Sequence, residues 1–365
     1  MKGIPVYFLL AAVLLFRSAS VAQGINDLKL KNFRPRSIYK SQQTETTKAK
    51  YPAIDMHSHD NPNTDIEKLI KLMDETGIEK QIILSYSTGA RFDSILARYV
   101  PYKDRFEVWC GFDYSTLDQS DWPRQAIAEL ERCYKKGARG VGELGDKGLG
   151  EFYSHPVPGW GLHIDDPRMK PLLQKCAELK MPINVHVAED EWMYQPADST
   201  NDGLMNAAKW KVDMNKKGII DHDQLIQTLE NAVRDNPKTI FIACHLANCC
   251  ADLSKLARLL DKYPNLYADL AARFAEFSPV PRYTRAFMEK YQDRLVFGAD
   301  TDGSELPYEK DLYKTSFRIL ETADEHFYKF NLFSYHWPLY GLALSDKTLK
   351  KIYRENAKRI LAHKD

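Results

Sequence analysis

The sequence predicts an α/β protein, a (β/α)8 TIM barrel. Eight short apolar segments rich in β-branched residues begin near Tyr51, amphipathic helical segments separate them, and the alternation extends over about 310 residues, which suits one barrel. A doubly wound open sheet is the alternative for such a pattern. No glycine-rich phosphate-binding turn follows the first segment, so the barrel is favoured.

The expected strands end at polar residues or at breaks in the hydrophobic run. They cover Ala53–His59, Gln81–Tyr86, Val108–Asp113, Gly140–Leu144, Ile183–Glu189, Ile240–Leu246, Leu266–Ala271 and Leu295–Asp300. We refer to them in this order as the first to the eighth strand.

Start and stop signals mark the helices between these strands. Thr64 and Glu67 have the spacing of a capping box, and Gly77 is placed to end the same helix. Asp166 followed by Pro167 predicts the start of the helix after the fourth strand.

The N-terminus has the pattern of a secretory signal peptide, which we assign to residues 1–22. Lys2 precedes an unbroken apolar run over residues 6–16, and small residues follow. This run is too short for a comfortable membrane span, which argues against the alternative of an uncleaved anchor. We therefore expect an exported protein, periplasmic or secreted, with no stable membrane span once it is mature. A polar N-terminal arm would occupy residues 23–50 and one barrel domain residues 51–365.

Composition excludes some partners and leaves others open. The chain has 51 basic and 50 acidic residues, and this balance gives no reason to expect nucleic acid or an anionic membrane as a partner. Its six cysteines match no disulfide framework, and we interpret four of them as small buried side chains. The redox state of the adjacent Cys249 and Cys250 stays open, as does homo-oligomer formation.

Two connections between strands and helices are unusually long. Residues 146–168 follow the fourth strand, residues 190–223 follow the fifth, and both contain several aromatic residues. In a barrel such connections project over the C-terminal face, where active sites lie. We predict that they shape a substrate site, with plain surface elaboration as the alternative.

Histidines and a carboxylate gather at the predicted C-terminal ends of the strands. His57 and His59 lie two residues apart in the first strand, so both are expected to point into the barrel. His186 lies toward the C-terminal end of the fifth strand, His245 lies near the end of the sixth, and Asp300 ends the eighth. Packing alone hardly explains all five placements, and imidazoles placed together bind Zn²⁺ and related ions. We therefore predict a metal centre.

This combination of residues resembles the amidohydrolase superfamily, and within it the amidohydrolase-2 branch of metal-dependent hydrolases, lactonases and decarboxylases. Further likeness comes from the segments Ile164–Pro167, Gly298–Thr301 and Asn356–Leu361. The resemblance covers about residues 51–363. It is specific for the superfamily but not for a substrate.

The resemblance implies a role for each residue. His57, His59, His186 and Asp300 would ligate a divalent ion, with Zn²⁺ as the expected ion and a water molecule in an open position. The metal would lower the pKa of that water to about 7. Asp300 would accept the proton of the water and pass it to the leaving group. His245 would orient the water or polarise a substrate carbonyl.

Glu143, near the end of the fourth strand, leaves the number of metal ions open. In some binuclear relatives a carboxylate on this strand bridges two metals. No lysine that could be carboxylated occupies the strand here, so one ion is favoured and two stay possible, with Glu143 as the bridge. Asp55 is expected to face inward one layer deeper than His57, in a structural role.

A small-molecule substrate would bind beside this centre. Arg273 and Arg282, after the seventh strand, could hold a substrate carboxylate through their bidentate donors, with ordinary surface ion pairs as the alternative. We expect a hydrolase that uses metal-bound hydroxide on an amide, lactone or ester. The alternatives are a metal-dependent non-oxidative decarboxylase of a carboxylic acid and a non-catalytic exported binding protein.

Overall fold

The computed structural model describes residues 26–208, 211–333 and 335–362. The predicted signal peptide, residues 1–22, therefore lies outside the described part of the chain. The chain divides into two compact units, the first ending at Arg34 and the second beginning at Pro35. The first contains the short 3-10 turn η1 (Leu30–Asn32), and the second contains the other described helices and strands.

Eight parallel strands form the centre of the second unit: β1 (Ala53–Ser58), β2 (Ile78–Leu84), β3 (Phe106–Trp109), β4 (Val141–Asp146), β5 (Ile183–Val187), β6 (Phe241–Ala243), β7 (Leu266–Asp269) and β8 (Leu295–Val296). β1 to β3 pair in one sheet and β4 to β8 in another. Cys110 N–H donates to Gly140 O (3.0 Å) and joins the sheets between β3 and β4, while Met56 N–H donates to Phe297 O (2.9 Å) and joins β1 to the chain after β8. The strands therefore close in chain order, which confirms the predicted (β/α)8 barrel.

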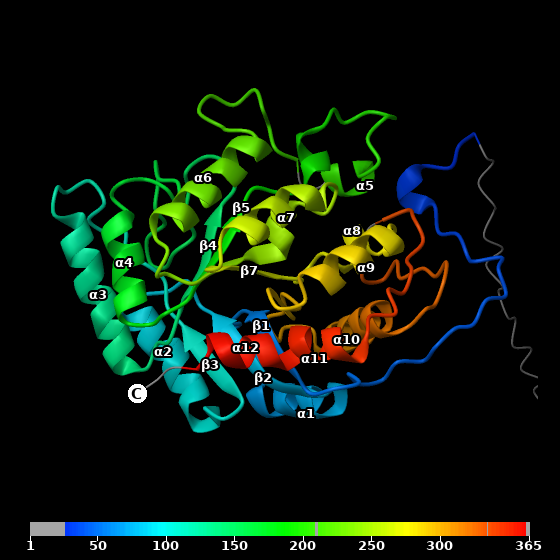
Figure 1. Cartoon of the computed structure of the whole chain (residues 1–365), viewed down its shortest axis with the longest axis horizontal. Helices are drawn as coiled ribbons and strands as arrows, with labels where there is room; N and C mark the ends of the chain where they lie inside the picture. Colours follow the sequence, from blue (N-terminus) through cyan, green and yellow to red (C-terminus); the bar gives the residue numbers. More distant parts are fainter. Residues whose placement is uncertain (1–25, 209–210, 334, 363–365) are drawn as a thin grey trace, which may run out of the picture. The chain divides into compact units, whose positions relative to one another are not determined.

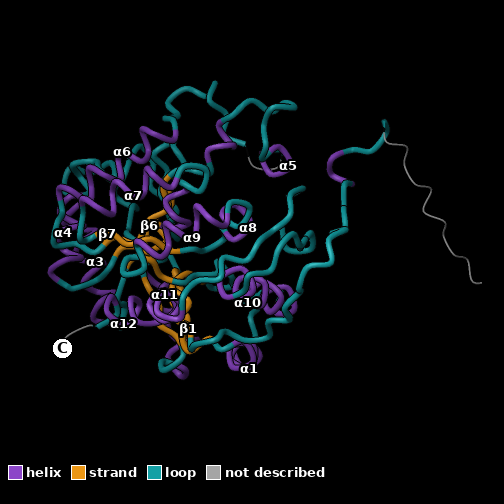
Figure 2. The backbone as a smooth tube through the Cα atoms, turned by 45° about the vertical axis from the view of Figure 1, so that its right-hand side comes forward, coloured by secondary structure: helices purple, strands orange, loops and turns teal. Residues whose placement is uncertain are grey.

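Helices surround these strands (Figures 1 and 2). They are α1 (Ile66–Thr76), α2 (Gly89–Tyr99), α3 (Trp122–Lys136), α4 (Lys170–Glu178), α5 (Leu204–Ala207), α6 (His222–Asp235), α7 (Leu253–Lys262), α8 (Phe274–Phe277), α9 (Pro281–Lys290), α10 (Leu306–Glu321), α11 (Asp346–Lys350) and α12 (Asn356–Ile360). Shorter turns are η2 (Val100–Tyr102), η3 (Glu191–Tyr194), η4 (Cys244–Asn248) and the π-helical η5 (Lys351–Glu355).

Two predicted helix starts are wrong, one by one residue and the other by three. The cap of α1 is Asp65, whose Oδ1 accepts from Lys68 N–H (3.1 Å), while the hydroxyl of Thr64 donates to Asp302 O instead. The predicted stop at Gly77 is confirmed, because its φ of 85° is left-handed. α4 begins at Lys170, because Asp166 closes a separate turn by accepting from Arg168 N–H.

β1 does not keep a strict two-residue alternation, because its pairing with β2 shifts register between Asp55 and Ser58. Ile54 and Met56 belong to an apolar cluster that also takes residues from β2, β3, β6 and β8 and therefore fills the barrel. Asp55 instead accepts a hydrogen bond from Tyr313 Oη of α10 (2.5 Å). The expectation that Asp55 faces the same way as His57 is wrong for this reason.

The cysteines and the start of the second unit complete the fold. All six cysteines are buried, and none of them, Cys249 and Cys250 included, forms a disulfide in the structure. Thr44 N–H and its hydroxyl donate to the carboxylate of Asp324, so the segment before β1 packs on α10 and the loop after it. Among the described helices, none is long and apolar enough to cross a membrane.

Candidate metal centre

Two histidines and a carboxylate meet where the chain leaves β1 and β8. Nε2 of His59 lies 3.2 Å from Oδ1 of Asp300, and Nε2 of His57 lies 3.7 Å from the same oxygen. These three ligand atoms fall within 4.8 Å of one another. Imidazole and carboxylate donors at this spacing can hold a single divalent ion.

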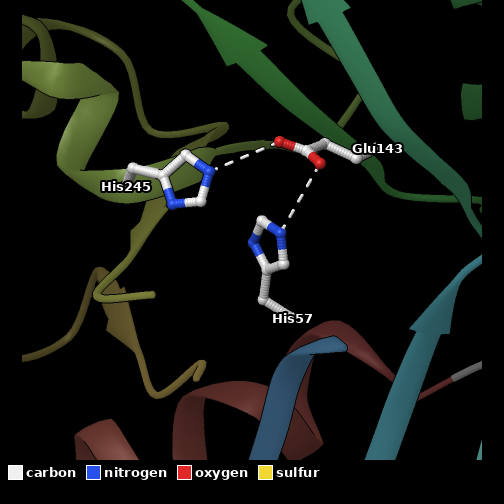
Figure 3. A group of neighbouring side chains, drawn as sticks. All are labelled: His57, Glu143 and His245. Atoms are coloured by element: carbon white, nitrogen blue, oxygen red, sulfur yellow. Dashed lines mark ion pairs between the residues drawn. The ribbon is translucent and has the colours of Figure 1, made fainter. Parts of the chain in front are cut away.

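Glu143 of β4 lies between this group and His245. Its Oε2 is 3.5 Å from His59 Nε2 and 3.7 Å from His57 Nε2, and its Oε1 is 3.4 Å from His245 Nε2. Figure 3 shows the carboxylate facing both His57 and His245. His57, Glu143 and His245 therefore form a second possible ligand group that shares His57 with the first.

His186 of β5 lies against Glu143 and belongs to none of the possible ligand groups, the third of which is His57, Cys244 and Asp269. Its Nδ1 donates to Glu143 Oε1 (2.7 Å) and its Nε2 donates to Ala188 O (2.9 Å). Burial alone would lower the pKa of His186, but Glu143 and Glu189 raise it to about 9. To ligate a metal directly, as the sequence predicts, the ring would have to give up one of these two contacts.

The arrangement of His57 fits a cation. Its Nδ1 donates to Asp269 Oδ2 (2.9 Å), and although burial alone would lower the pKa of His57, Asp269 and Glu143 raise it well above its usual value. Its Nε2 is buried, has no hydrogen-bond partner among the described residues, and faces the oxygens of Asp300 and Glu143 at 3.7 Å each. The site therefore favours a positive charge at Nε2, and a metal ion bound there would take the place of a proton. The residues present therefore fit a metal ion.

The local electrostatics keep the carboxylates ionised and His245 neutral. Burial alone would raise the pKa of Asp300, but the hydrogen bond with His59 and the nearby imidazoles lower it. Burial likewise opposes the low pKa of Glu143, which His186 and His245 set well below its usual range. Burial lowers the pKa of His245, whose Nδ1 donates to Ala271 O (2.8 Å). Its Nε2 is therefore available as an acceptor.

Asp269, at the end of β7, is the site residue that sequence reasoning missed. Besides orienting His57, its Oδ1 accepts hydrogen bonds from the backbone of His245 (2.8 Å) and of Ala271 (3.1 Å). A carboxylate that fixes the tautomer of a metal-binding histidine is a recurrent partner in metal sites. The signal in the sequence was an aspartate near the end of a predicted strand, a position like those of His186, His245 and Asp300.

His245 is carried by a strained turn. In η4 the four residues from His245 to Asn248 all have φ between 54° and 58°, which costs free energy for residues other than glycine. Asn248 holds the turn, because its Nδ2 donates to Val187 O and Ala188 O and its Oδ1 accepts from Arg273. Contacts with the segments that follow β5 and β7 therefore hold the turn, and with it His245, in this conformation.

A cavity of about 500 Å³ opens beside the cluster, and Glu143, His186, His245 and Asp300 form part of its wall. Both long connections reach it, through Tyr153 on the first and through Met193 and Asn206 on the second. Trp210, on the second connection, lies outside the described residues. A third segment, missed from the sequence, supplies Leu332, Phe333 and Tyr335 from the chain after α10.

The two predicted substrate-binding arginines lie in different surroundings. Arg273 lines this cavity, but its guanidinium is buried and bonded to Asn248, to Ala272 O and, at 3.2 Å, to Asp190. Arg282 is exposed near the start of α9 and does not line the cavity. Lys147 lines the wall too, in an ion pair with Glu189.

Comparison with known protein families shows which family the chain belongs to. The model of the amidohydrolase family Amidohydro_2 matches residues 42–362, which is most of the chain. The chain belongs to this amidohydrolase family. No curated protein matches it.

Solved structures that resemble this amidohydrolase share its fold at low sequence identity. A TIM-barrel protein from Bordetella bronchiseptica has a TM-score of 0.55 at 16% identity, covering 85% of this chain and 98% of that one. A putative amidohydrolase from Staphylococcus aureus has a TM-score of 0.52 at 16% identity, with 85% and 99% covered. A 5-carboxyvanillate decarboxylase from Novosphingobium aromaticivorans, complexed with manganese and a nitrobenzoic acid, has a TM-score of 0.52 at 13% identity, with 88% and 99% covered.

Proposed function

We propose that this amidohydrolase is a metal-dependent hydrolase that cleaves an amide, lactone or ester bond of a small molecule. The observation that carries the proposal is the buried Nε2 of His57, which faces two carboxylates beside a cavity of about 500 Å³. Cavities of this size suit small organic substrates. Zn²⁺ is the expected ion, since the donors are imidazoles and carboxylates.

His57, His59 and Asp300 would hold the ion. His186 or Glu143 would complete the set, with a single ion favoured and Glu143 as the bridge if there are two. The ion, when bound, lowers the pKa of water to about 7 and so makes a nucleophile available at neutral pH. Asp269 keeps a proton of His57 on Nδ1, so that Nε2 is the nitrogen that would ligate the metal.

The remaining roles concern protons and orientation. Asp300, whose low pKa keeps it ionised, would accept a proton from the attacking water and deliver it to the leaving group. His245 lines the cavity, and it would orient the water or polarise the carbonyl of the substrate. The walls of the cavity, which include residues of both long connections, would hold the substrate.

Decarboxylation of a carboxylic acid is the second candidate. Tyr153, Tyr308, Phe333 and Tyr335 give the cavity an aromatic wall, and Arg273 adds a cation. The Novosphingobium structure that shares the fold bears the name of a decarboxylase. Against this, the contacts of Arg273 with Asn248 and Asp190 occupy much of its guanidinium. A non-catalytic binding protein is less favoured, because it needs no carboxylate such as Asp300 beside a metal.

The first test is the metal content of purified protein by elemental analysis. We expect about one equivalent of a transition metal in the wild type, lost in the double variant His57→Ala/His59→Ala and retained in the control His336→Ala, which changes a histidine outside the cluster. Two equivalents would assign Glu143 as a bridge. Wild-type protein that takes up no metal on reconstitution would overturn the proposal and leave the binding-protein alternative.

The second test separates the two reactions. The metal-loaded protein is screened with lactones, esters and amides in a pH-stat and with aromatic acids in a carbon dioxide assay. Acid release from the lactones or esters, or free amine released from the amides, supports the hydrolase, and carbon dioxide from the aromatic acids assigns the decarboxylase. We also propose that residues 1–22 direct export of the protein. Recovery of the protein from the cytoplasm with residues 1–22 still attached would contradict this proposal.

A further inference from the structure

A second cavity, of about 390 Å³, lies on the His59 side of the metal centre. We call it the acidic pocket, and it is defined by Asp60, Asp302, Glu305, Glu309, Tyr86 and Tyr308, together with His59 and Asp300 of the centre. Asp300 and Tyr308 line both this pocket and the larger cavity. A single small molecule could therefore reach from the metal centre into the acidic pocket.

The charges that line the acidic pocket are unbalanced. Five carboxylates line it, and none of its lining residues is a lysine or an arginine. Asp60 is paired with Arg98 (2.5 Å), and Asp300 belongs to the metal centre. Asp302 accepts only neutral donors in the contacts described, from Asn61 (3.2 Å) and from Ser304 N–H (2.9 Å). Glu305 has no ion-pair partner in the described part of the chain.

Glu309 is the observation that points to a ligand. It is 2% exposed and lines the pocket from α10, yet its Oε2 has no hydrogen-bond partner among the described residues. Leaving a buried carboxylate oxygen without a partner costs free energy. Burial raises the pKa of Glu309 to about 7, so the side chain is poised to ionise if a cation arrives.

We infer that the acidic pocket receives the cationic end of the substrate, an ammonium or guanidinium group, while the bond to be cleaved lies at the metal centre. The inference rests on the proposed function, and it adds the substrate class. When Glu309 turns its carboxylate toward the pocket that it lines, an N–H donor there would satisfy Oε2 in a charge-assisted hydrogen bond. Tyr86 and Tyr308 offer aromatic surfaces for the cation or its alkyl stem. A divalent ion is less favoured, because the pocket is far larger than one ion and Glu309 belongs to none of the ligand groups found among the described residues.

The test compares two probes of the same shape, butylguanidinium and the neutral butylurea, by calorimetric titration of metal-loaded protein. Guanidinium is a weak metal ligand, so its binding reports on the pocket. We expect the cation to bind at least about tenfold more tightly than the urea, because hydrogen bonds between charged groups contribute that much affinity. Glu309→Gln should remove most of this preference, and Glu305→Gln should reduce it.

The control is Glu355→Gln, which removes one negative charge from an exposed position outside both cavities and should leave the preference unchanged. Thermal unfolding shows whether Glu309→Gln is folded, and the exposed Glu305→Gln provides a second variant. Equal binding of the two probes to the wild type would overturn the inference. A second metal equivalent that Glu309→Gln removes would also overturn it, since the pocket would then bind a metal ion and not an organic cation. Failure of the wild type to take up any metal would instead overturn the proposed function.

Discussion

The carboxylate of Asp269 lies 2.9 Å from Nδ1 of His57, and both side chains are fully buried. This contact fixes which nitrogen of His57 carries the proton, and the other nitrogen faces Asp300 and Glu143. Metal affinity should therefore depend on a residue that does not touch the metal.

We predict that Asp269→Asn weakens metal binding by about 10- to 100-fold, because the amide orients His57 less firmly and makes it a poorer donor. The dissociation constant, measured by competition with a chelator, checks this. Asp261→Asn, which changes an exposed carboxylate on α7, is the control and should leave the affinity unchanged. An unchanged affinity in Asp269→Asn, with the fold intact, would show that this contact does not prepare His57 for a metal.

Gly298 provides a second prediction about His57. A Cβ atom at this position would lie 2.8 Å from Cβ of His57 and 3.2 Å from Cβ of Ala271. We predict that Gly298→Ala destabilises the protein by about 1–3 kcal/mol through overpacking and lowers metal affinity by displacing His57. Denaturant unfolding and chelator competition measure the two effects. A Gly298→Ala variant with wild-type stability and wild-type metal affinity would contradict the prediction.

The sequence was sufficient for the parts of the fold and site that depend on local pattern. Eight apolar segments with helical spacers specify the barrel, and strand-end residues such as His57, His245 and Asp300 come together because parallel strands end on one face. The strand-end positions of these three residues were therefore enough to predict that they meet. The roles assigned to these residues remain predictions.

The missed features depend on contacts between distant segments or on small backbone shifts. The register shift in β1 turns Asp55 toward Tyr313, and no two-residue period can foresee it. Asp269 resembles any strand-end aspartate until His57 is seen beside it. Arg273 and Arg282 look equivalent in sequence, but helix geometry after β7 brings only the first to the cavity.

In the strained turn that carries His245, we expect a core substitution that does not lower the free energy of unfolding, unlike most core substitutions. Ala247 is fully buried with a φ of 54°, a conformation that glycine adopts without steric cost. We predict that Ala247→Gly is neutral or stabilises the protein by up to about 1 kcal/mol in denaturant unfolding. Ala232→Gly, at a buried position within the right-handed helix α6, is the control and should destabilise by about 1 kcal/mol or more. Equal destabilisation by both changes would mean that η4 is not strained.

Glu230 offers a prediction about pH that is independent of the metal centre. It is 4% exposed on α6, and its carboxylate accepts from Arg258 (2.6 Å), Lys262 (3.0 Å) and Tyr263 Oη (2.8 Å). Burial alone would raise its pKa, but the hydrogen bonds from these three side chains lower it to about 2. Because the folded pKa lies below that of the unfolded chain, folding favours the ionised form.

Between about pH 4.5 and pH 2 the unfolded chain binds more protons at Glu230 than the folded chain, so its contribution to stability rises with pH across that window. We predict that Glu230→Gln lowers the free energy of unfolding by about 1–2 kcal/mol at pH 7, a value reduced because Arg258 and Lys262 are largely exposed to solvent. The difference from wild type should shrink as pH falls from about 4.5 toward 2 in denaturant titrations. Glu178→Gln, at an exposed ion pair with Lys175, should change stability by less than about 0.5 kcal/mol at either pH. A difference for Glu230→Gln that stays constant with pH would show that the lost contribution is packing and not charge.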